Sequence, residues 1–388
     1  MELKAVLLIA VTMLGMCYAL LGSLKLVLAE RLEITEDKVG GLVAAFGFMV
    51  GPVILASGFL TDSLGRKGVW LAGAVLVGAS LLLLARIRSY RGAVVAVLML
   101  GSGWAMMVNV SNVLGSIVFA ENLVSGMSYI DFVFGLGAFM MPMSVAWLLA
   151  RMKFPGMVTL FGTVTVVPAL CILFVSVDQA PAAAANAGAT IHTFSEMLNS
   201  PVLWLCCLTM LFYAPLEFSM AAWATTLVKR QAAEGAPAEQ TERMASLALS
   251  GFWLCFLGSR MLSAILGSDN VGHALHVVLA VLGTAGLLGI VYSRKRQMTI
   301  ALVMFCGFVF GPVFPVLIAI LLKPMATEVS GRAVGFLFAG ASIGWTLIPP
   351  LIGRIADRIN LQRGFLVAVA SSVVFLGLVI AHYIVHAR

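Results

Sequence analysis

The residues best suited to chemistry in this sequence are a few polar side chains that lie inside long apolar runs. Glu217 lies about sixteen residues into the run 201–228, and Met210 and Tyr213 precede it on the same helical face. A carboxyl group this far from either end of a run can bind a polar ligand, bind a proton, or make a structural hydrogen bond to a neighbouring helix. We favour a ligand-binding and proton-binding role for Glu217, with Tyr213 lining the same cavity.

A second polar stripe lies in the run 92–120. Asn109, Asn112 and Ser116 follow one another at i, i+3 and i+7, so a helix presents them on one face. Side-chain amides supply donors and acceptors without charge, which suits a neutral ligand rich in hydroxyl groups. Hydrogen bonding between helices explains the stripe equally well. Tyr18, in the run 5–28, is a weaker candidate for the same cavity.

Other kinds of chemistry are hard to build from this sequence. The five histidines lie in loops or near the ends of runs, and the six cysteines fall inside apolar runs without metal-ligand spacing. No glycine-rich phosphate loop follows a strand, and no nucleophile motif is present. The sequence therefore predicts that the protein is not an enzyme and that it has no cofactor and no metal site.

The composition indicates that lipid is the solvent of this chain. Of 388 residues, 61% are hydrophobic and 11% charged, and the mean hydropathy is +1.06. Soluble domains carry about 25% charged residues. Twelve apolar runs are long enough to cross a bilayer core of roughly 30 Å as helices. They lie near 5–28, 39–61, 69–86, 92–120, 125–150, 156–177, 201–228, 245–267, 273–292, 299–322, 331–352 and 365–386.

We predict an all-α integral membrane protein with two six-helix bundles. Residues 1–177 form the first, 178–200 a linker with a short surface helix, and 201–388 the second. Gly137 precedes Pro142 as Gly344 precedes Pro349, at an offset of 207 residues. The tripeptide VSG recurs at an offset of 205, and the related tetrapeptides YALL and YAPL at 195. The matches predict two homologous halves that enter the membrane from the same side, as a parallel repeat.

The charged loop between the second and third runs carries the most specific pattern. It reads Gly58-x-x-x-Asp62-x-x-Gly65-Arg66-Lys67. This spacing resembles the loop signature of the major facilitator superfamily, in which twelve helices form two bundles. The resemblance implies a carrier that works by alternating access.

The resemblance also implies a cytoplasmic gate at this loop. The acidic residue of the signature, here Asp62, would cap the N-terminal end of the eleventh helix, which we place near Gly331. A carboxylate there meets unpaired N–H groups and the positive end of the helix dipole. Arg66 and Lys67 would hold the loop at the lipid headgroups.

Several looser motifs resemble the fucose permease branch of that superfamily, a group of sugar–proton symporters. The stretch LFYAPLEFSMAAW contains Tyr213, Glu217 and Trp223, and FWLCFLGSRML contains Arg260. The resemblance implies a small-molecule substrate, a neutral sugar first, whereas a coupling ion, proton or sodium, cannot be carried over from the branch. Known symporters of the branch use acids in spans one and four, which this chain lacks. Proton coupling here would therefore depend on Glu217.

A second gate contact is predicted between the two halves. Asp131 in span five and Arg260 in span eight both lie about 10 Å inside the cytoplasmic end, at 1.5 Å per residue. Opposite charges at one depth on facing helices stabilise each other. Each residue finding a partner in its own half is the alternative.

The distribution of basic residues conflicts with the orientation that the family implies. The side of both termini carries six Lys and Arg residues and the opposite side sixteen, whereas the positive-inside rule places the richer side in the cytoplasm. We expect cytoplasmic termini, because the loop signature works as a cytoplasmic gate. We also expect a monomer in a bacterial-type inner membrane that binds no nucleic acid. An exporter of amphipathic or drug-like compounds and a non-transporting membrane sensor remain as alternatives.

Overall fold

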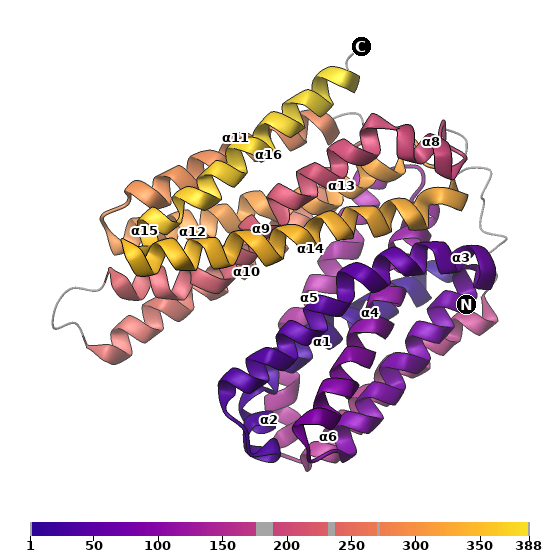
Figure 1. Ribbon diagram of the computed structural model, residues 1–388, viewed down its shortest axis with the longest axis horizontal. Coiled ribbons are helices and arrows are strands. Elements are labelled where there is room, and N and C mark those ends of the chain that lie inside the picture. The colour runs from indigo at the N-terminus through magenta and orange to yellow at the C-terminus, as the bar shows by residue number, and fades with distance from the viewer. Residues whose placement is uncertain (1, 176–188, 232–236, 270–271, 387–388) are drawn as a thin grey trace. The chain divides into compact units, whose positions relative to one another are not determined.

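The computed structural model describes residues 2–175, 189–231, 237–269 and 272–386, and nearly all of them are helical (Figure 1). Eleven described helices are long and apolar enough to span a membrane. The elements are α1 (Leu3–Ser23), α2 (Lys25–Leu32), α3 (Glu36–Arg86), α4 (Tyr90–Val118), α5 (Leu123–Leu149), α6 (Phe154–Leu170), η1 (Cys171–Phe174), α8 (Phe194–Asn199), α9 (Pro201–Arg230), α10 (Ala238–Leu266), α11 (Gly272–Tyr292), α12 (Arg296–Phe310), α13 (Val313–Leu322), α14 (Thr327–Arg358), α15 (Leu361–Gly364) and α16 (Leu366–His386).

The long helix α3 accommodates two of the twelve predicted spans. Its backbone leaves the helical region at Gly65, with φ 68° and ψ 163°. Residues other than glycine rarely adopt this conformation, so Gly65 allows the chain to turn between one span and the next. The predicted all-helical membrane fold is therefore confirmed, with the second and third runs forming the two arms of α3.

Two other predicted runs are interrupted. The first run divides at Leu24 into α1 and α2, and the tenth divides into α12 and α13 at Gly311 and Pro312. Pro312 has no N–H to donate to the preceding turn, which favours a break there. A further difference concerns α14, which begins at Thr327 and not near Gly331 as predicted.

The chain divides into two compact units. Unit 1 is Met1–Glu121, Ile130–Met197 and Leu322–Ala339, and unit 2 is Asn122–Tyr129, Leu198–Leu321 and Gly340–Arg388. Most of each unit comes from one predicted half, but the first turns of α5 and α14 belong to the unit of the other half. The boundaries proposed from the sequence remain a prediction.

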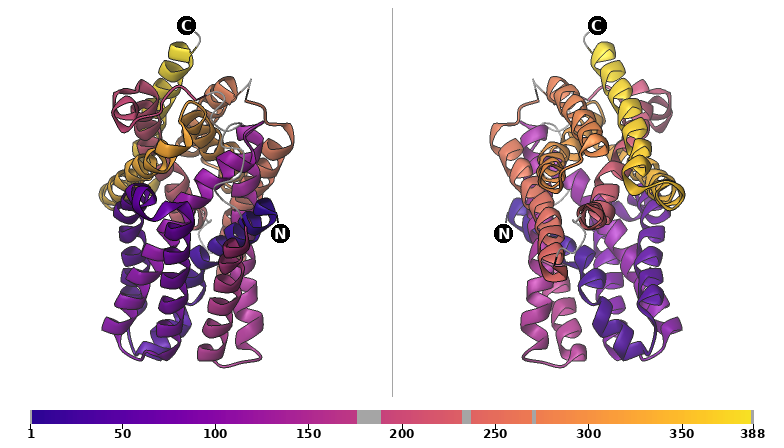
Figure 2. Two further views of the ribbon diagram at one scale, coloured as in Figure 1. Left: turned by 90° about the vertical axis from the view of Figure 1, so that its right-hand side faces the viewer. Right: turned by 90° about the vertical axis from the view of Figure 1, so that its left-hand side faces the viewer.

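Unit 1 is built on helix contacts that small residues permit. Helix α3 packs along α4 and α6, and Figure 2 shows the indigo-to-magenta helices of residues 3–170 from two further sides. A Cβ atom on Gly73 would lie 2.8 Å from the carbonyl oxygen of Gly103, and one on Gly103 would lie 2.6 Å from that of Gly73. The two backbones therefore touch, which is how helices associate closely in lipid.

The repeat read from the sequence has a structural counterpart. In unit 1, Gly137 of α5 lies against the backbone of α1, where a Cβ would come within 2.0 Å of the Thr12 carbonyl oxygen. In unit 2, Gly344 of α14 lies against α9, where a Cβ would come within 2.1 Å of the Leu211 carbonyl oxygen. Equivalent glycines thus let equivalent helices cross in the two halves. Unit 2 is otherwise held by packing of α10 on α12 and of α16 on α9 and α11.

Candidate functional site

Unit 2 brings the predicted Tyr213 and Glu217 together on α9. The buried Tyr213 hydroxyl lies 2.7 Å from the carbonyl oxygen of Phe310, at the end of α12, and 3.2 Å from Glu217 Oε2. Glu217 is part-buried. The break between α12 and α13 places the Phe310 carbonyl beyond the regular helix ladder, so it can accept this bond. The pair is therefore anchored to a second helix.

Arg260 of α10 supplies a positive charge to the same region. Its Nε donates to the carbonyl oxygen of Gly311 at 3.0 Å, and its guanidinium lies 4.3 Å from the centre of the Phe256 ring. Gly311 directly follows Phe310, the residue that Tyr213 binds, so Arg260 and Tyr213 bind neighbouring carbonyl groups at the end of α12. Arg260 is thus part of the Tyr213–Glu217 cluster, a grouping that the sequence did not predict. The predicted pair of Arg260 with Asp131, which is buried in α5 in unit 1, stays a prediction.

The stripe on α4 is buried, and its members have different contacts. Asn109 Nδ2 donates to the carbonyl oxygens of Ile54 in α3 and Gly331 in α14, each at 2.9 Å. Asn112 Nδ2 donates at 2.9 Å to the carbonyl oxygen of Val108 in its own helix, and the Ser116 hydroxyl donates to Val113 in the same way. Asn109 therefore ties three helices together, whereas the bonds that Asn112 and Ser116 make among the described residues stay within α4.

Tyr18 belongs to an aromatic cluster in unit 1. Its ring stacks on Trp104 with centroids 5.7 Å apart and also contacts Phe46 and Phe134, so α1, α3, α4 and α5 each contribute one ring. Tyr18 is 48% exposed and Trp104 only 5%. The cluster thus presents one accessible aromatic face, which can stack on a sugar ring or on an apolar ring system.

The signature loop engages the first turns of α14. Asp62 forms an ion pair with Arg332, and Arg66 Nη2 donates to the carbonyl oxygen of Thr327 at 2.8 Å. The prediction that Asp62 caps the first N–H groups of this helix was wrong in its geometry, because α14 begins at Thr327, ahead of the residue that Asp62 contacts. A side-chain ion pair takes the place of the backbone cap.

The two helices meet there at their backbones. A Cβ on Gly58 would lie 2.5 Å from the carbonyl oxygen of Gly331, next to the carbonyl that Asn109 binds. Lys67 donates to the carbonyl oxygens of Leu173 and Val175, at 2.9 and 3.4 Å, and so ties the loop to the end of the sixth span.

The sequence reading missed an equivalent arrangement in unit 2. Asp269 Oδ1 accepts a hydrogen bond at 2.9 Å from the backbone N–H of Val124, at the start of α5, and Asn122 donates to the carbonyl oxygen of Gly267. Asp269 lies 207 residues after Asp62, the offset that already relates Gly137 to Gly344. Applying that offset to the signature acid would have found it.

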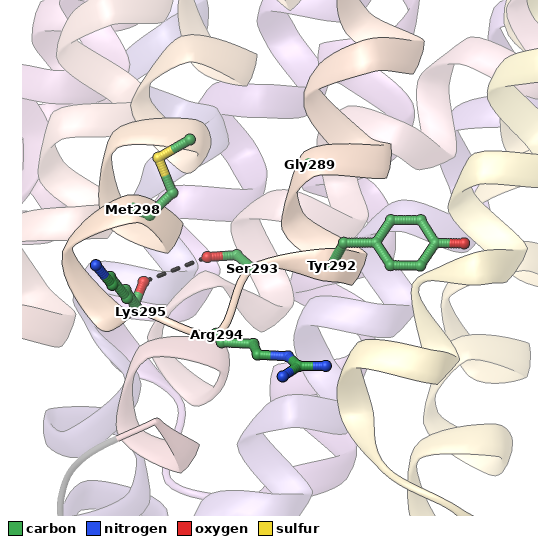
Figure 3. Close-up of a pocket in the computed structure, with 6 residues that line it drawn as sticks. All are labelled: Gly289, Tyr292, Ser293, Arg294, Lys295 and Met298. Atoms are coloured by element: carbon green, nitrogen blue, oxygen red, sulfur yellow. Dashed lines mark hydrogen bonds between the residues drawn. The ribbon is translucent and has the colours of Figure 1, made fainter.

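A shallow pocket of about 350 Å³ lies elsewhere in unit 2, at the loop between α11 and α12. Figure 3 shows the side chains of Tyr292, Arg294 and Lys295 pointing in different directions from this loop. None of the predicted site residues lines it. Because its polar groups do not converge, we do not assign it to the functional site.

The profile of the Major Facilitator Superfamily matches residues 6–349. The chain belongs to the major facilitator superfamily. It is accordingly a multi-pass membrane transporter and not an enzyme. No curated protein sequence matches it at a significant level.

Solved structures of major facilitators share the fold at low identity. A fucose:proton symporter of E. coli has 16% identity and a TM-score of 0.75, over 96% of this chain and 97% of the other. A second structure of such a transporter, described as being in the outward conformation, has 16% identity and a TM-score of 0.74 with the same coverage. The human organic anion transporter TETRAN has 16% identity and a TM-score of 0.74, over 97% and 98% of the two chains. The resemblance to the fucose permease branch is confirmed as a likeness of fold.

Proposed function

We propose that this transporter moves a small polar organic solute, a neutral sugar first, by alternating access, with Glu217 as the proton site. The observation that carries the proposal is the contact between Tyr213 and Glu217, which is anchored to Phe310 inside otherwise apolar helices. Ionisable groups are costly within a membrane and mark substrate or ion pathways there. The likeness of fold to a fucose:proton symporter is compatible with this substrate class.

The hydrogen bonds of Tyr213 support a proton-binding role for Glu217. The hydroxyl group has a single proton, and the shorter contact is the one to the Phe310 carbonyl, which can only accept. When the hydroxyl donates its proton to that carbonyl, it can only accept a hydrogen bond from Glu217. A protonated Glu217 carboxyl group supplies that donor. When Glu217 loses that proton, the single hydroxyl proton of Tyr213 can be donated either to the carboxylate or to the Phe310 carbonyl, but not fully to both. Protonation of Glu217 thus changes the link between α9 and α12.

Unit 1 has candidate ligand groups of its own. Asn112, Ser116 and Tyr18 offer an amide, a hydroxyl and an accessible ring, which is the set of groups that a sugar ring uses. Asn109 is the member of the stripe whose donors are already engaged by two other helices. We therefore keep it as a ligand residue only for a state in which the contact with Gly331 is broken.

The contacts around Asp62 support a gate on the side of both termini, which we place in the cytoplasm. Asp62, Arg66 and Asn109 all bind the first turns of α14, so these bonds must break if that helix is to move away from α3. Lys67 holds the loop to the sixth span, and Asp131 with Arg260 remains a proposed second contact.

Uptake into proteoliposomes tests the substrate class. The purified protein would be given labelled neutral hexoses and pentoses, organic anions and lipophilic cations, with and without an inward proton gradient. We expect gradient-dependent uptake of at least one neutral sugar, and uptake confined to the other two classes would contradict the proposal. Thermal stabilisation by a sugar without uptake of any compound would indicate a sensor.

An exporter of amphipathic compounds is the second candidate. The specific observation in its favour is the cluster around Tyr18, whose accessible ring and aromatic neighbours suit an apolar ring system. Transport of lipophilic cations in the same experiment, abolished by Tyr18→Ser and with no sugar uptake, would favour this candidate.

A further inference from the structure

The end of the linker between the bundles is attached to the start of α14. The N–H groups of Thr190 and Ile191 both donate to the carbonyl oxygen of Pro324 at 3.0 Å, and Ala326 N–H donates back to Ile191 at 2.8 Å. Ile191 and Met325 form a short parallel bridge and are both buried. All of these residues lie within unit 1. The linker therefore forms defined backbone bonds with the segment that leads into the gate helix.

A capping box then fixes the short helix α8. Glu196 Oε2 accepts from the N–H groups of His192 and Thr193, at 2.8 and 3.1 Å, while Thr193 Oγ1 accepts from Glu196 N–H at 3.2 Å. This reciprocal pattern satisfies N–H groups that a helix start leaves without partners. The capping box therefore fixes the backbone on both sides of Phe194, the first residue of α8, from which the Phe194 ring projects.

Phe194 meets the gate arginine. Its ring lies 5.4 Å from the Phe59 ring of α3, with the two planes at 75°, so together they form a corner. The guanidinium carbon of Arg332 lies 5.2 Å from the centre of the Phe194 ring and 5.5 Å from that of Phe59. A guanidinium at this distance over an aromatic face is attracted by the ring quadrupole.

The ion pair between Arg332 and Asp62 is partly exposed to solvent, so contacts that order the arginine side chain affect how stable the pair is. The side chain of Arg332 is 17% exposed and that of Asp62 is 43% exposed. Ion pairs exposed to this extent contribute little by themselves, because water screens the charges and two long side chains must be ordered. A corner of two rings removes much of the rotational freedom of the arginine before it meets the carboxylate, so the pair forms at a smaller entropic cost.

We propose that Phe194 of the linker is a positioning residue for the gate: its ring, with that of Phe59, holds the Arg332 guanidinium against Asp62. The inference rests on the proposed gate and adds the linker to it. Phe194 contacts no substrate in this assignment and acts only through Arg332. Movement of the linker away from α14 then weakens the ion pair without any change in the signature loop itself.

Hydrogen–deuterium exchange of the full-length protein tests the assignment without a known substrate. Exchange would be followed in peptides covering 322–336 for the parent, Phe194→Leu, Phe194→Trp and Arg332→Gln, and for the double variant with Phe194→Leu and Arg332→Gln. Leucine keeps an apolar side chain but has no aromatic ring and therefore no ring quadrupole, whereas tryptophan keeps a ring quadrupole. Phe48→Leu, which changes an exposed ring on α3, is the matched control.

We expect Phe194→Leu to speed exchange in this segment about two- to tenfold, the range that a cation–π contact implies. Phe194→Trp should restore the parent rate, Phe48→Leu should leave it unchanged, and Phe194→Leu should add nothing when Arg332 is already Gln. An equal effect of Phe194→Leu in both backgrounds would overturn the assignment, because it would show packing alone. If Arg332→Gln speeds exchange and Phe194→Leu does not, the assignment fails while the gate stands. If neither does, the gate itself fails.

Discussion

Two neighbouring asparagines on α4 show how the surroundings of a side chain decide its role. Asn109 donates to the carbonyl oxygens of Ile54 and Gly331 on two other helices, whereas Asn112 donates to Val108 in its own helix. Periodicity places both residues on one face, but it does not show which of them faces another backbone. The contact with Gly331 exists because Gly58 and Gly331 let α3 and α14 touch.

Asn109→Leu should destabilise the folded protein more than Asn112→Leu. The first substitution removes two hydrogen bonds between helices, and the free energy of unfolding should fall by about 1–2 kcal/mol. The second removes one bond within a helix, so its effect should be well below that. Unfolding of both variants in mixed micelles would measure the difference. Equal losses for the two would contradict the role assigned to Asn109.

Residue spacing predicted a contact within one helix, but not the geometry of the contact between Asp62 and α14. Tyr213 and Glu217 meet because they are four residues apart on α9, a relation that the sequence contains. The pairing of Asp62 with Arg332 rather than with the helix backbone depends on where α14 begins. Ala326, the residue before that start, donates to Ile191, which lies far away in the sequence, so local spacing does not contain this contact.

Among the helices and loops, the apolar runs predicted where the helices lie better than they predicted the breaks inside them. The break in α3 at Gly65 lies in the loop that the charges marked, whereas the division of α12 from α13 lies inside an apolar run. Hydropathy does not detect such a division, because the residues on both sides are equally apolar. The first part of the predicted linker lies outside the described residues, and its end forms the predicted surface helix, α8.

The capping box of α8 should be sensitive to acid. Hydrogen bonds from the His192 and Thr193 N–H groups hold the pKa of Glu196 below its usual value. A lowered pKa in the folded state means that the carboxylate stabilises the linker at neutral pH, and that this is lost as the pH falls through the lowered pKa. Protection of the amides in peptides covering 189–199, corrected for the intrinsic exchange rate at each pH, should therefore be high at pH 7 and lower in acid.

Glu196→Gln should exchange faster than the parent at pH 7 and lose most of that acid dependence. Glu239→Gln, an acid in the first turn of α10, serves as the control. An unchanged acid dependence in Glu196→Gln would show that another group controls the linker.

At the scale of the whole molecule, the charge distribution and the gate give opposite orientations. In the topology predicted from the sequence, the side opposite the termini carries the larger number of Lys and Arg residues, while the loop with Asp62 and Arg66 lies on the side of the termini. The positive-inside rule concerns how short loops orient while the chain inserts into the membrane, whereas the gate contacts belong to the folded carrier. We give the gate precedence and propose that both termini lie in the cytoplasm.

Cysteine labelling decides this orientation. Ser63→Cys lies in the signature loop, and Ser89→Cys lies between α3 and α4 at the other end of the spans. An impermeant thiol reagent added to intact cells should label Cys introduced at position 89 and should reach position 63 only after permeabilisation. The parent chain, with its natural cysteines alone, gives the background. Labelling at position 63 in intact cells would place the termini outside.

We propose that proton movement through Glu217 drives accumulation of the substrate. The decisive measurement compares the parent, Glu217→Gln and the control Glu242→Gln, an acid paired with Lys229 near the start of α10. Proteoliposomes containing each protein would be assayed with the sugar that the uptake panel selects, first with a proton gradient and then by exchange without one. We predict that Glu217→Gln abolishes gradient-driven accumulation and keeps exchange, whereas Glu242→Gln keeps both. Uphill, pH-dependent accumulation by Glu217→Gln at the parent level would contradict the account.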